Sequence, residues 1–221
     1  MGVSEKVPRK KIRVLVVDDH PIVRQGIKGV LEQQVDLVLC GEAEDAGAAL
    51  KAINTSRPDI VILDISLRGS DGLDVTKSIR ASNPKLPVLV MSMHSESLYA
   101  GRALRAGANG YIMKTEVAAN LIQAVRQILA GDIYLSESAR QIILLEVQDG
   151  GAGAASPLKR LSDRELEVFR LIGAGRSTQA IADELHLSVK TIETHRTHVK
   201  EKLGLKTAAD VLRYAVQFGE S

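Results

Sequence analysis

The chain contains 221 residues, of which 45% are hydrophobic and 25% are charged, and its formal net charge is +2 at pH 7. This balance is typical of a globular protein and excludes a disordered or a membrane-embedded chain, while the length is comfortable for two domains. Segment 1–11 lacks the apolar core of a signal peptide, and no apolar stretch approaches the ~18 residues that span a membrane, so we expect a cytoplasmic protein without membrane contacts.

Strand and helix patterns alternate from residue 12 to residue 130 and repeat about every 25 residues, as in successive βαβ units. The predicted strands are short and rich in β-branched residues, and they cover 14–17, 37–40, 60–63, 87–92 and 111–113. The predicted helices cover 22–31, 45–53, 73–81, 96–106 and 117–129. Five strands that alternate with five helices predict an α/β fold with a doubly wound, five-stranded parallel sheet in flavodoxin-like order.

Four of the predicted strands end in a reactive side chain. Asp18 and Asp19 follow the first strand, Asp64 follows the third, Ser92 ends the fourth and Lys114 follows the fifth. The carboxyl ends of parallel strands form the crevice in which ligands bind, so we expect these side chains to meet at one edge. Three carboxylates suit Mg²⁺, and a lysine with a hydroxyl can stabilise a transferred phosphoryl group.

The sequence beyond residue 130 changes in character. A further helix is predicted over 136–147, and the Gly- and Ala-rich segment 149–157 is typical of a flexible linker. Only helical patterns follow, and Ser162 with Glu165 forms a capping box that starts the first of four predicted helices. These helices cover 162–172, 179–185, 188–203 and 207–216.

The third of these helices concentrates positive charge. Five basic and two acidic residues lie between Lys190 and Lys206, although residues 157–221 as a whole hold only 11 basic and 9 acidic side chains. A short helix, a turn at 186–187 and this longer helix have the spacing of a helix-turn-helix, whose second helix enters the major groove of DNA. Without that spacing, the same charges would describe an ordinary solvated helix.

The two halves of the chain each resemble a known domain. Residues 12–130 resemble the receiver domain of two-component systems, and residues 158–218 resemble the LuxR-type helix-turn-helix, so the whole chain is similar to response regulators of the NarL/FixJ family. The resemblance is carried by the stretches Val16–Pro21, Asp64–Leu67, Gly110–Lys114, Leu161–Glu165 and Thr191–Arg196.

The receiver resemblance implies that Asp64 accepts a phosphoryl group from a sensor histidine kinase. It also implies that Asp19 and Asp64 bind Mg²⁺ together with the backbone carbonyl of Ser66, while Asp18 acts mostly through the metal's waters. Lys114 would pair with the phosphoryl group. Since this chemistry is limited to self-directed phosphoryl transfer and slow autodephosphorylation at Asp64, the resemblance implies a regulator rather than an enzyme.

The resemblance further implies a switch, in which Ser92 swings to bond the phosphoryl group and Tyr111 changes rotamer in step. A half-buried structural aromatic is the alternative for Tyr111. The chain departs from the usual pattern in three places: Ser92 replaces Thr, the pair Leu67-Arg68 replaces Met-Pro, and Lys114 precedes Thr115 rather than Pro. The missing proline at Arg68 should loosen the loop that follows, and Thr115 puts in doubt the cis peptide that many receivers have there.

The DNA-binding resemblance implies contacts from the helix over 188–203. The expected base-facing residues are Glu193, Thr194 and Thr197, and the expected phosphate contacts are Lys190, Thr191, Arg196 and Lys200. We therefore expect a receiver domain over 11–131, a linker with one helix over 132–156 and a DNA-binding domain over 157–221. Phosphorylation would free or dimerise the last domain on double-stranded promoter DNA, and the helix from Thr207 is a candidate homodimer contact.

Three other functions fit parts of the sequence. A haloacid-dehalogenase-like phosphatase also uses an aspartate nucleophile, but it needs Asp-x-Asp where this chain has Asp18-Asp19-His20. A quorum-sensing regulator needs an aromatic-lined ligand pocket, whereas this chain has no Trp and only 4 Tyr. The third is a regulator that never uses phosphate: the departure at Arg68 favours it, and the complete acidic site argues against it. His20 and His94 flank the acidic site, and we assign neither of them a chemical role.

Overall fold

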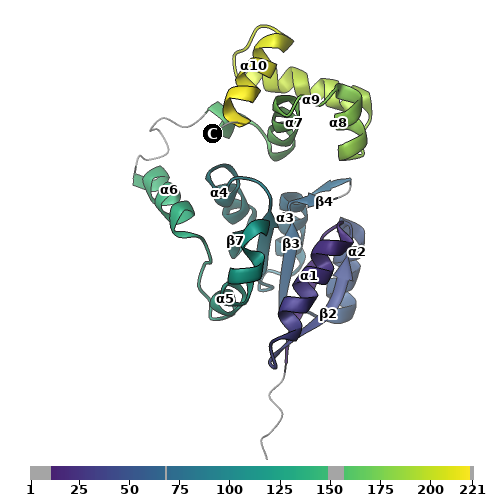
Figure 1. Ribbon diagram of the computed structural model, residues 1–221, viewed down its shortest axis with the longest axis vertical. Coiled ribbons are helices and arrows are strands. Elements are labelled where there is room, and N and C mark those ends of the chain that lie inside the picture. Colours follow the sequence, from purple (N-terminus) through teal and green to yellow (C-terminus); the bar gives the residue numbers. More distant parts are fainter. Residues whose placement is uncertain (1–10, 68, 149–156, 220–221) are drawn as a thin grey trace, which may run out of the picture.

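The computed structural model describes residues 11–67, 69–148 and 157–219, and it combines a sheet flanked by helices with a separate group of helices (Figure 1). Arg68 and the predicted linker, segment 149–156, lie outside the described residues. None of the described helices is both long and apolar enough to cross a lipid bilayer.

Five parallel strands form the main sheet, in the order β2-β1-β3-β6-β7. Their bounds are β1 Ile12–Val17, β2 Leu37–Ala43, β3 Ile60–Asp64, β6 Val88–Ser92 and β7 Gly110–Met113. This is the flavodoxin-like order, in which the chain starts near one edge and reverses direction once. The structure therefore confirms the predicted fold of the first half.

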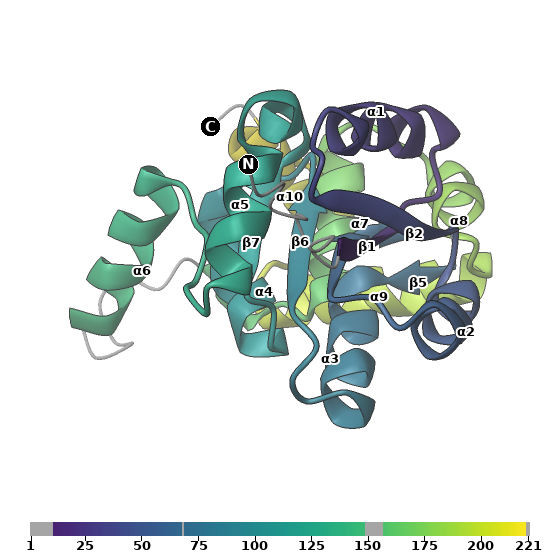
Figure 2. The ribbon, with the colours of Figure 1, turned by 90° about the horizontal axis from the view of Figure 1, so that it is seen from below.

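Helices cover both faces of the sheet, and this explains why the strand sequences are continuous apolar runs. Successive side chains of a strand point to opposite faces, so Val14 and Val16 of β1 enter one buried cluster while Leu15 and Val17 enter the other. Figure 2 shows the resulting layers. The first cluster is closed by α1 (Pro21–Glu32) and α5 (Val117–Leu129), and the second by α2 (Ala46–Ser56), α3 (Gly72–Ser82) and α4 (Glu96–Ala106).

A small hairpin that the sequence analysis missed follows β3. The strands β4 (Ser66–Leu67) and β5 (Ser70–Asp71) pair antiparallel, and Gly69 takes a positive φ of 70° in the turn. A glycine beside Arg68 thus supplies the positive φ of this turn, and the expected effect of the missing proline concerns Arg68 itself, which lies outside the described residues. No cis peptide bond occurs among the described residues, in line with Thr115 after Lys114.

The second half of the structure is helical, as predicted. The helix α6 (Glu137–Gln148) precedes the linker, and beyond it come η2 (Pro157–Arg160), α7 (Asp163–Gly173), α8 (Thr178–Leu185), α9 (Val189–Lys202) and α10 (Ala208–Gly219). The capping box at the start of α7 is present, with Ser162 N–H 2.7 Å from Glu165 Oε2. Glu165 Oε2 also lies 2.6 Å from Lys202 Nζ, an ion pair that anchors the end of α9 on α7.

Candidate functional site

Three carboxylates and a histidine converge at the carboxyl edge of the sheet. One ligand atom each from Asp18, Asp19, His20 and Asp64 can be chosen so that all four lie within 4.8 Å of one another. Asp18 and Asp64 are buried, with exposed fractions of 0% and 1%, while the side chain of Asp19 is 20% exposed. The structure thus brings the three predicted carboxylates together because β1 and β3 are neighbours in the sheet.

The carboxylate oxygens of this cluster have lone pairs available for a further ligand. Asp18 Oδ2 and Asp19 Oδ1 are buried, and among the described residues they face charged or titratable groups rather than a full set of hydrogen-bond donors. Their close partners are cationic or titratable groups, Lys114 Nζ at 2.8 Å and His20 Nδ1 at 2.7 Å. Buried oxygens with unused lone pairs are the donor set of a hard divalent cation. The residues present therefore fit the metal that the sequence predicts.

Lys114 joins the two buried carboxylates. Its Nζ lies 2.8 Å from Asp18 Oδ2 and 2.8 Å from Asp64 Oδ2. Burial opposes the charge of Lys114, but Asp64 and Asp18 outweigh it and raise the pKa of the ammonium. Burial raises the pKa of Asp64 to about 6, with Asp18 adding to the shift and Lys114 opposing it. A divalent cation at this position would favour the ionised carboxylate that a nucleophile requires.

The two predicted switch residues lie deeper in the same edge. Ser92 pairs with Met113 in the sheet, so it stands beside the strand that delivers Lys114, and it is fully buried. Tyr111 is also fully buried rather than half-buried, and its hydroxyl donates a 2.6 Å hydrogen bond to the carbonyl of His94. Ser92 Oγ accepts a 2.9 Å hydrogen bond from the His94 N–H. Both side chains therefore meet at the backbone of one residue.

That residue, His94, was left without a role by the sequence analysis. It is 8% exposed, and its Nε2 lies 3.1 Å from Oγ of Ser66 in the hairpin. Burial lowers the pKa of His94 to about 4, and the positive charges of Arg170 and Lys114 add to the effect, so the imidazole is neutral. Sequence alone offers no signal for these contacts, since histidine two residues beyond a strand end is equally common on a solvated loop.

Gly72 is a second residue of the site that spacing could not reveal. A Cβ at this position would lie 2.1 Å from the carbonyl oxygen of Asp64 and 2.7 Å from Cα of Ile65. Both are backbone atoms, which cannot rotate away as the end of a side chain can. The start of α3 therefore packs against the loop that holds Asp64 only because position 72 lacks a side chain.

Gly72→Ala is accordingly expected to lower the free energy of unfolding by at least about 2 kcal/mol through overpacking. Urea denaturation followed by circular dichroism measures this change. Gly29→Ala is the matched control, because a Cβ at Gly29 of α1 meets nothing within 4 Å, and a helical Gly→Ala exchange is neutral or stabilising. Equal stability of the two variants would contradict the tight approach at Gly72.

The predicted DNA contacts on α9 fall on two sides of the helix. Lys190 and the predicted base-facing residues are exposed, whereas Thr191, Arg196 and Lys200 are partly buried. Four of the seven line a hollow of about 230 Å³ beside α10, namely Glu193, Arg196, Thr197 and Lys200. Thr191 instead lines a cavity of about 420 Å³ that is closed by Ser70, Asp71 and other receiver residues. The receiver therefore borders one side of the helix.

A buried arginine joins the two halves of the protein. Arg102 of α4 is 9% exposed, and its guanidinium donates to the carbonyls of Leu158 at 2.9 Å and Leu161 at 2.8 Å. It also lies 2.8 Å from Asp163 Oδ1, at the first position of α7. The sequence gives no indication of this contact, because the pattern of α4 predicts its apolar face but not the partner of an arginine at its margin.

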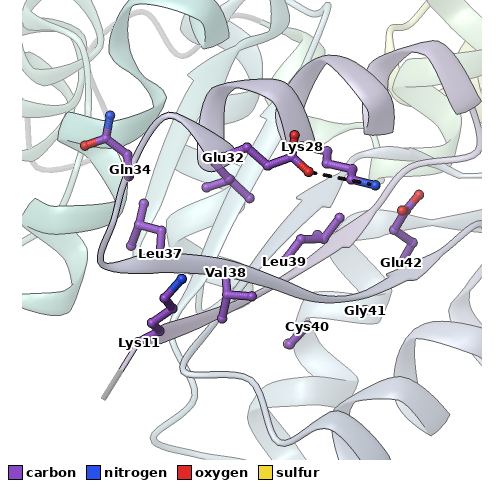
Figure 3. Close-up of a pocket in the computed structure, with 11 residues that line it drawn as sticks. Lys11, Lys28, Glu32, Gln34, Leu37, Val38, Leu39, Cys40, Gly41 and Glu42 are labelled. Atoms are coloured by element: carbon purple, nitrogen blue, oxygen red, sulfur yellow. Dashed lines mark ion pairs between the residues drawn. The ribbon is translucent and has the colours of Figure 1, made fainter. Parts of the chain in front are cut away.

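A groove of about 510 Å³ runs along the edge strand β2 and is shown in Figure 3. Lys11, Val38 and Cys40 are among its lining residues, and one ion pair, Lys28–Glu32 at 3.9 Å, crosses its rim. None of the four residues of the acidic cluster lines it. The groove therefore takes no part in the chemistry of the carboxyl edge.

Comparison with known families agrees with the two halves of the structure. Residues 14–126 match the model of the response regulator receiver domain. Residues 159–215 match the model of bacterial regulatory proteins of the luxR family. The first match covers the sheet with its acidic cluster, and the second covers α7 to α9 and most of α10. This pairing excludes the phosphatase interpretation and places a receiver where a quorum-sensing regulator would carry its ligand pocket.

Curated and solved relatives extend over nearly the whole chain. The oxygen regulatory protein NreC of Staphylococcus carnosus is 36% identical over 211 residues, which cover 93% of this chain and 97% of that protein. The structure is also similar to RcsB of Salmonella enterica serovar Typhimurium, which was solved bound to the promoter rprA in the presence of the phosphomimetic BeF3-. The two share 30% identity and a TM-score of 0.64, and the match covers 94% of this chain and 99% of that one. A structure of two RcsB dimers on two parallel DNAs shares 27% identity and a TM-score of 0.58, covering 96% and 100%.

Proposed function

The chain belongs to the two-component response regulators that join a receiver domain to a luxR-type DNA-binding domain, and from this premise we propose that phosphorylation of Asp64 controls its binding to promoter DNA. It is a transcription regulator rather than a classical enzyme. A sensor histidine kinase is the phosphoryl donor in this proposal, and slow autodephosphorylation ends the signal. The cytoplasm is its expected location, because promoter DNA is its target.

The contact that carries the proposal is the bridge from Lys114 to Asp64 and Asp18 at the strand ends. An oxygen of Asp64 attacks the phosphorus of the phosphohistidine, the P–N bond breaks, and the imidazole leaves. Lys114 then balances the negative charge on the transferred group. Asp18, Asp19, Asp64 and the Ser66 carbonyl would hold Mg²⁺, which supplies further positive charge to the phosphoryl oxygens.

The domain boundaries proposed are 11–131 for the receiver, 132–156 for the linker with α6, and 157–221 for the DNA-binding domain. Two observations support control between the domains. Arg102 ties α4 to the start of α7, and the receiver residues Ser70 and Asp71 border the same cavity as Thr191 of α9. Phosphorylation would therefore act by releasing the DNA-binding domain from this docked arrangement.

Homodimerisation on DNA completes the proposal. The helix α10 carries exposed apolar side chains, Leu212 at 43%, Val216 at 38% and Phe218 at 38%. Such a patch on a terminal helix suits contact with a second copy of the chain. RcsB, a relative of this chain, is described as dimeric on DNA, which favours the same assembly here.

The DNA role is tested by the salt dependence of binding to a mixed-sequence duplex. Affinity is expected to fall linearly on a log–log plot against salt, because lysine and arginine contacts displace counterions from phosphates. Lys190→Ala should weaken binding to all sequences alike and reduce the slope by about 1, as expected for one lost phosphate contact. Lys85→Ala, which changes an exposed receiver lysine, is the control and should leave the slope unchanged. An affinity that does not vary with salt would contradict the DNA-binding role.

A further inference from the structure

The backbone of His94 is shared by the two switch residues of the receiver. Its N–H donates to Ser92 Oγ at 2.9 Å, and its carbonyl accepts from the Tyr111 hydroxyl at 2.6 Å. Ser92 ends β6 and Tyr111 lies in β7, so the position of His94 is set by side chains of two adjacent strands. Any movement of the Ser92 hydroxyl away from the His94 N–H therefore removes one of the two backbone hydrogen bonds that position His94.

The side chain of His94 reaches in two directions. On one side, Nε2 is 3.1 Å from Oγ of Ser66, two residues beyond Asp64. On the other, the imidazole packs on the ring of Tyr99, with centroids 4.9 Å apart and planes inclined by 32°. Contacts between aromatic rings depend on their relative orientation, so a shift of one ring changes the position preferred by the other.

Tyr99 connects His94 to the DNA-binding domain. It lies on α4, is 2% exposed, and shares a small cavity of about 50 Å³ with Leu158, Leu166 and Phe169 from η2 and α7. Its hydroxyl is buried and finds no hydrogen-bond partner among the described residues. The ring rather than the hydroxyl therefore makes the contact, and Arg102, which holds α7, follows three residues later on the same helix.

We propose that His94 is the positioning residue that couples the phosphorylation state of Asp64 to the docking of α7, an inference that rests on the proposed function. When Asp64 carries a phosphoryl group, the Ser92 hydroxyl turns from the His94 N–H to a phosphoryl oxygen. His94 loses one of its two backbone bonds, its ring moves against Tyr99, and α4 releases α7. The coupling thus passes through a stacked pair of rings, His94 and Tyr99.

The test uses the full-length protein with Mg²⁺ and beryllofluoride, a stable mimic of the phosphoryl group. Fluorine NMR reports binding at Asp64, and amide hydrogen exchange reports the protection of α7 (Asp163–Gly173). In the unsubstituted protein, beryllofluoride is expected to raise the exchange rate of α7 on the order of 10-fold, a typical coupling between two sites. His94→Leu should bind beryllofluoride, but its α7 amides should exchange slowly in both states, with rates that differ by less than about twofold.

Matched variants separate coupling from simple structural support. Tyr99→Phe keeps the ring and loses only an unpartnered hydroxyl, so it should respond as the unsubstituted protein does, whereas Tyr99→Leu should behave like His94→Leu. His94→Gln can retain the contact to Ser66 without the ring, and it serves as the second variant if His94→Leu fails to fold. In His94→Gln, too, α7 exchange should no longer respond to beryllofluoride.

Four results would decide against the proposal. A full response in His94→Leu or His94→Gln overturns it. So does an α7 that exchanges rapidly in both states of those variants, since that marks His94 as structural support alone. If the unsubstituted protein binds beryllofluoride without any change in the exchange rate of α7, the two sites are not coupled. An unsubstituted protein that binds none refutes the phosphorylation of Asp64 and with it the proposed function.

Discussion

Asp64→Asn is expected to abolish the uptake of phosphate from radiolabelled acetyl phosphate, with labelling reduced to background. The asparagine amide matches the carboxylate in size, so the buried site should stay filled, but it offers no nucleophilic oxygen of sufficient basicity. It also removes one of the two carboxylates that Lys114 bridges at 2.8 Å. Labelling is measured with Mg²⁺ present, by separating the labelled protein on an acidic gel. The measurement is repeated after chelation of the metal, which should abolish labelling of the unsubstituted protein too.

The control for this experiment is Asp36→Asn. Asp36 has a carboxylate that is 41% exposed and pairs with Arg126 at 3.3 Å. It directly precedes β2, whose first residue Leu37 pairs with Ile12 at the amino end of β1, whereas the acidic cluster lies at the carboxyl edge of the sheet. Its labelling should equal that of the unsubstituted protein. Undiminished labelling of Asp64→Asn would place the phosphoryl group on another residue and would remove the assignment of Asp64. Undiminished labelling after chelation would remove the metal from the proposed mechanism.

The parallel sheet and its acidic edge were predictable because both follow from short-range patterns. A strand buried on both faces is recognised by its apolar run, as in β3, whose five residues are all buried. The residue that follows such a strand must lie at the carboxyl edge, so Asp64 and Lys114 were brought together without knowledge of any contact. The meeting of the carboxylates required only that β1 and β3 be neighbours, which the flavodoxin-like order provides.

The rest depended on contacts between residues far apart in sequence. Gly72 is needed because α3 starts against the Asp64 loop, and only the three-dimensional structure reveals that approach. His94 gains its partners from β4, β7 and α4, so no local pattern identifies it. The DNA contacts of α9 were expected from the family resemblance, but which side of that helix faces the receiver is set by packing between domains. Periodicity carries no information on such packing.

Arg102 offers the sharpest test of that packing. Its guanidinium is nearly buried and makes three charge-assisted contacts, to two carbonyls and to Asp163 Oδ1, all between 2.8 and 2.9 Å. Asp163 also lies 3.5 Å from Lys77 Nζ of α3, so a second, more exposed cation shares its charge. Because an exposed lysine at that distance is screened by water, the buried arginine should dominate the docking energy.

Arg102→Gln is therefore expected to weaken docking of α7 by about 2–5 kcal/mol, the usual cost of removing one partner from a buried charged contact. The exchange rate of the η2–α7 amides should rise at least on the order of 30-fold without phosphorylation, since each 1.4 kcal/mol is a factor of ten. Arg105→Gln, an exposed arginine three residues further along α4, is the matched control and should leave exchange unchanged. If α7 stays as protected in Arg102→Gln as in the control, the domains are held by apolar packing alone, and Tyr99 and its neighbours rather than Arg102 hold α7 against the receiver.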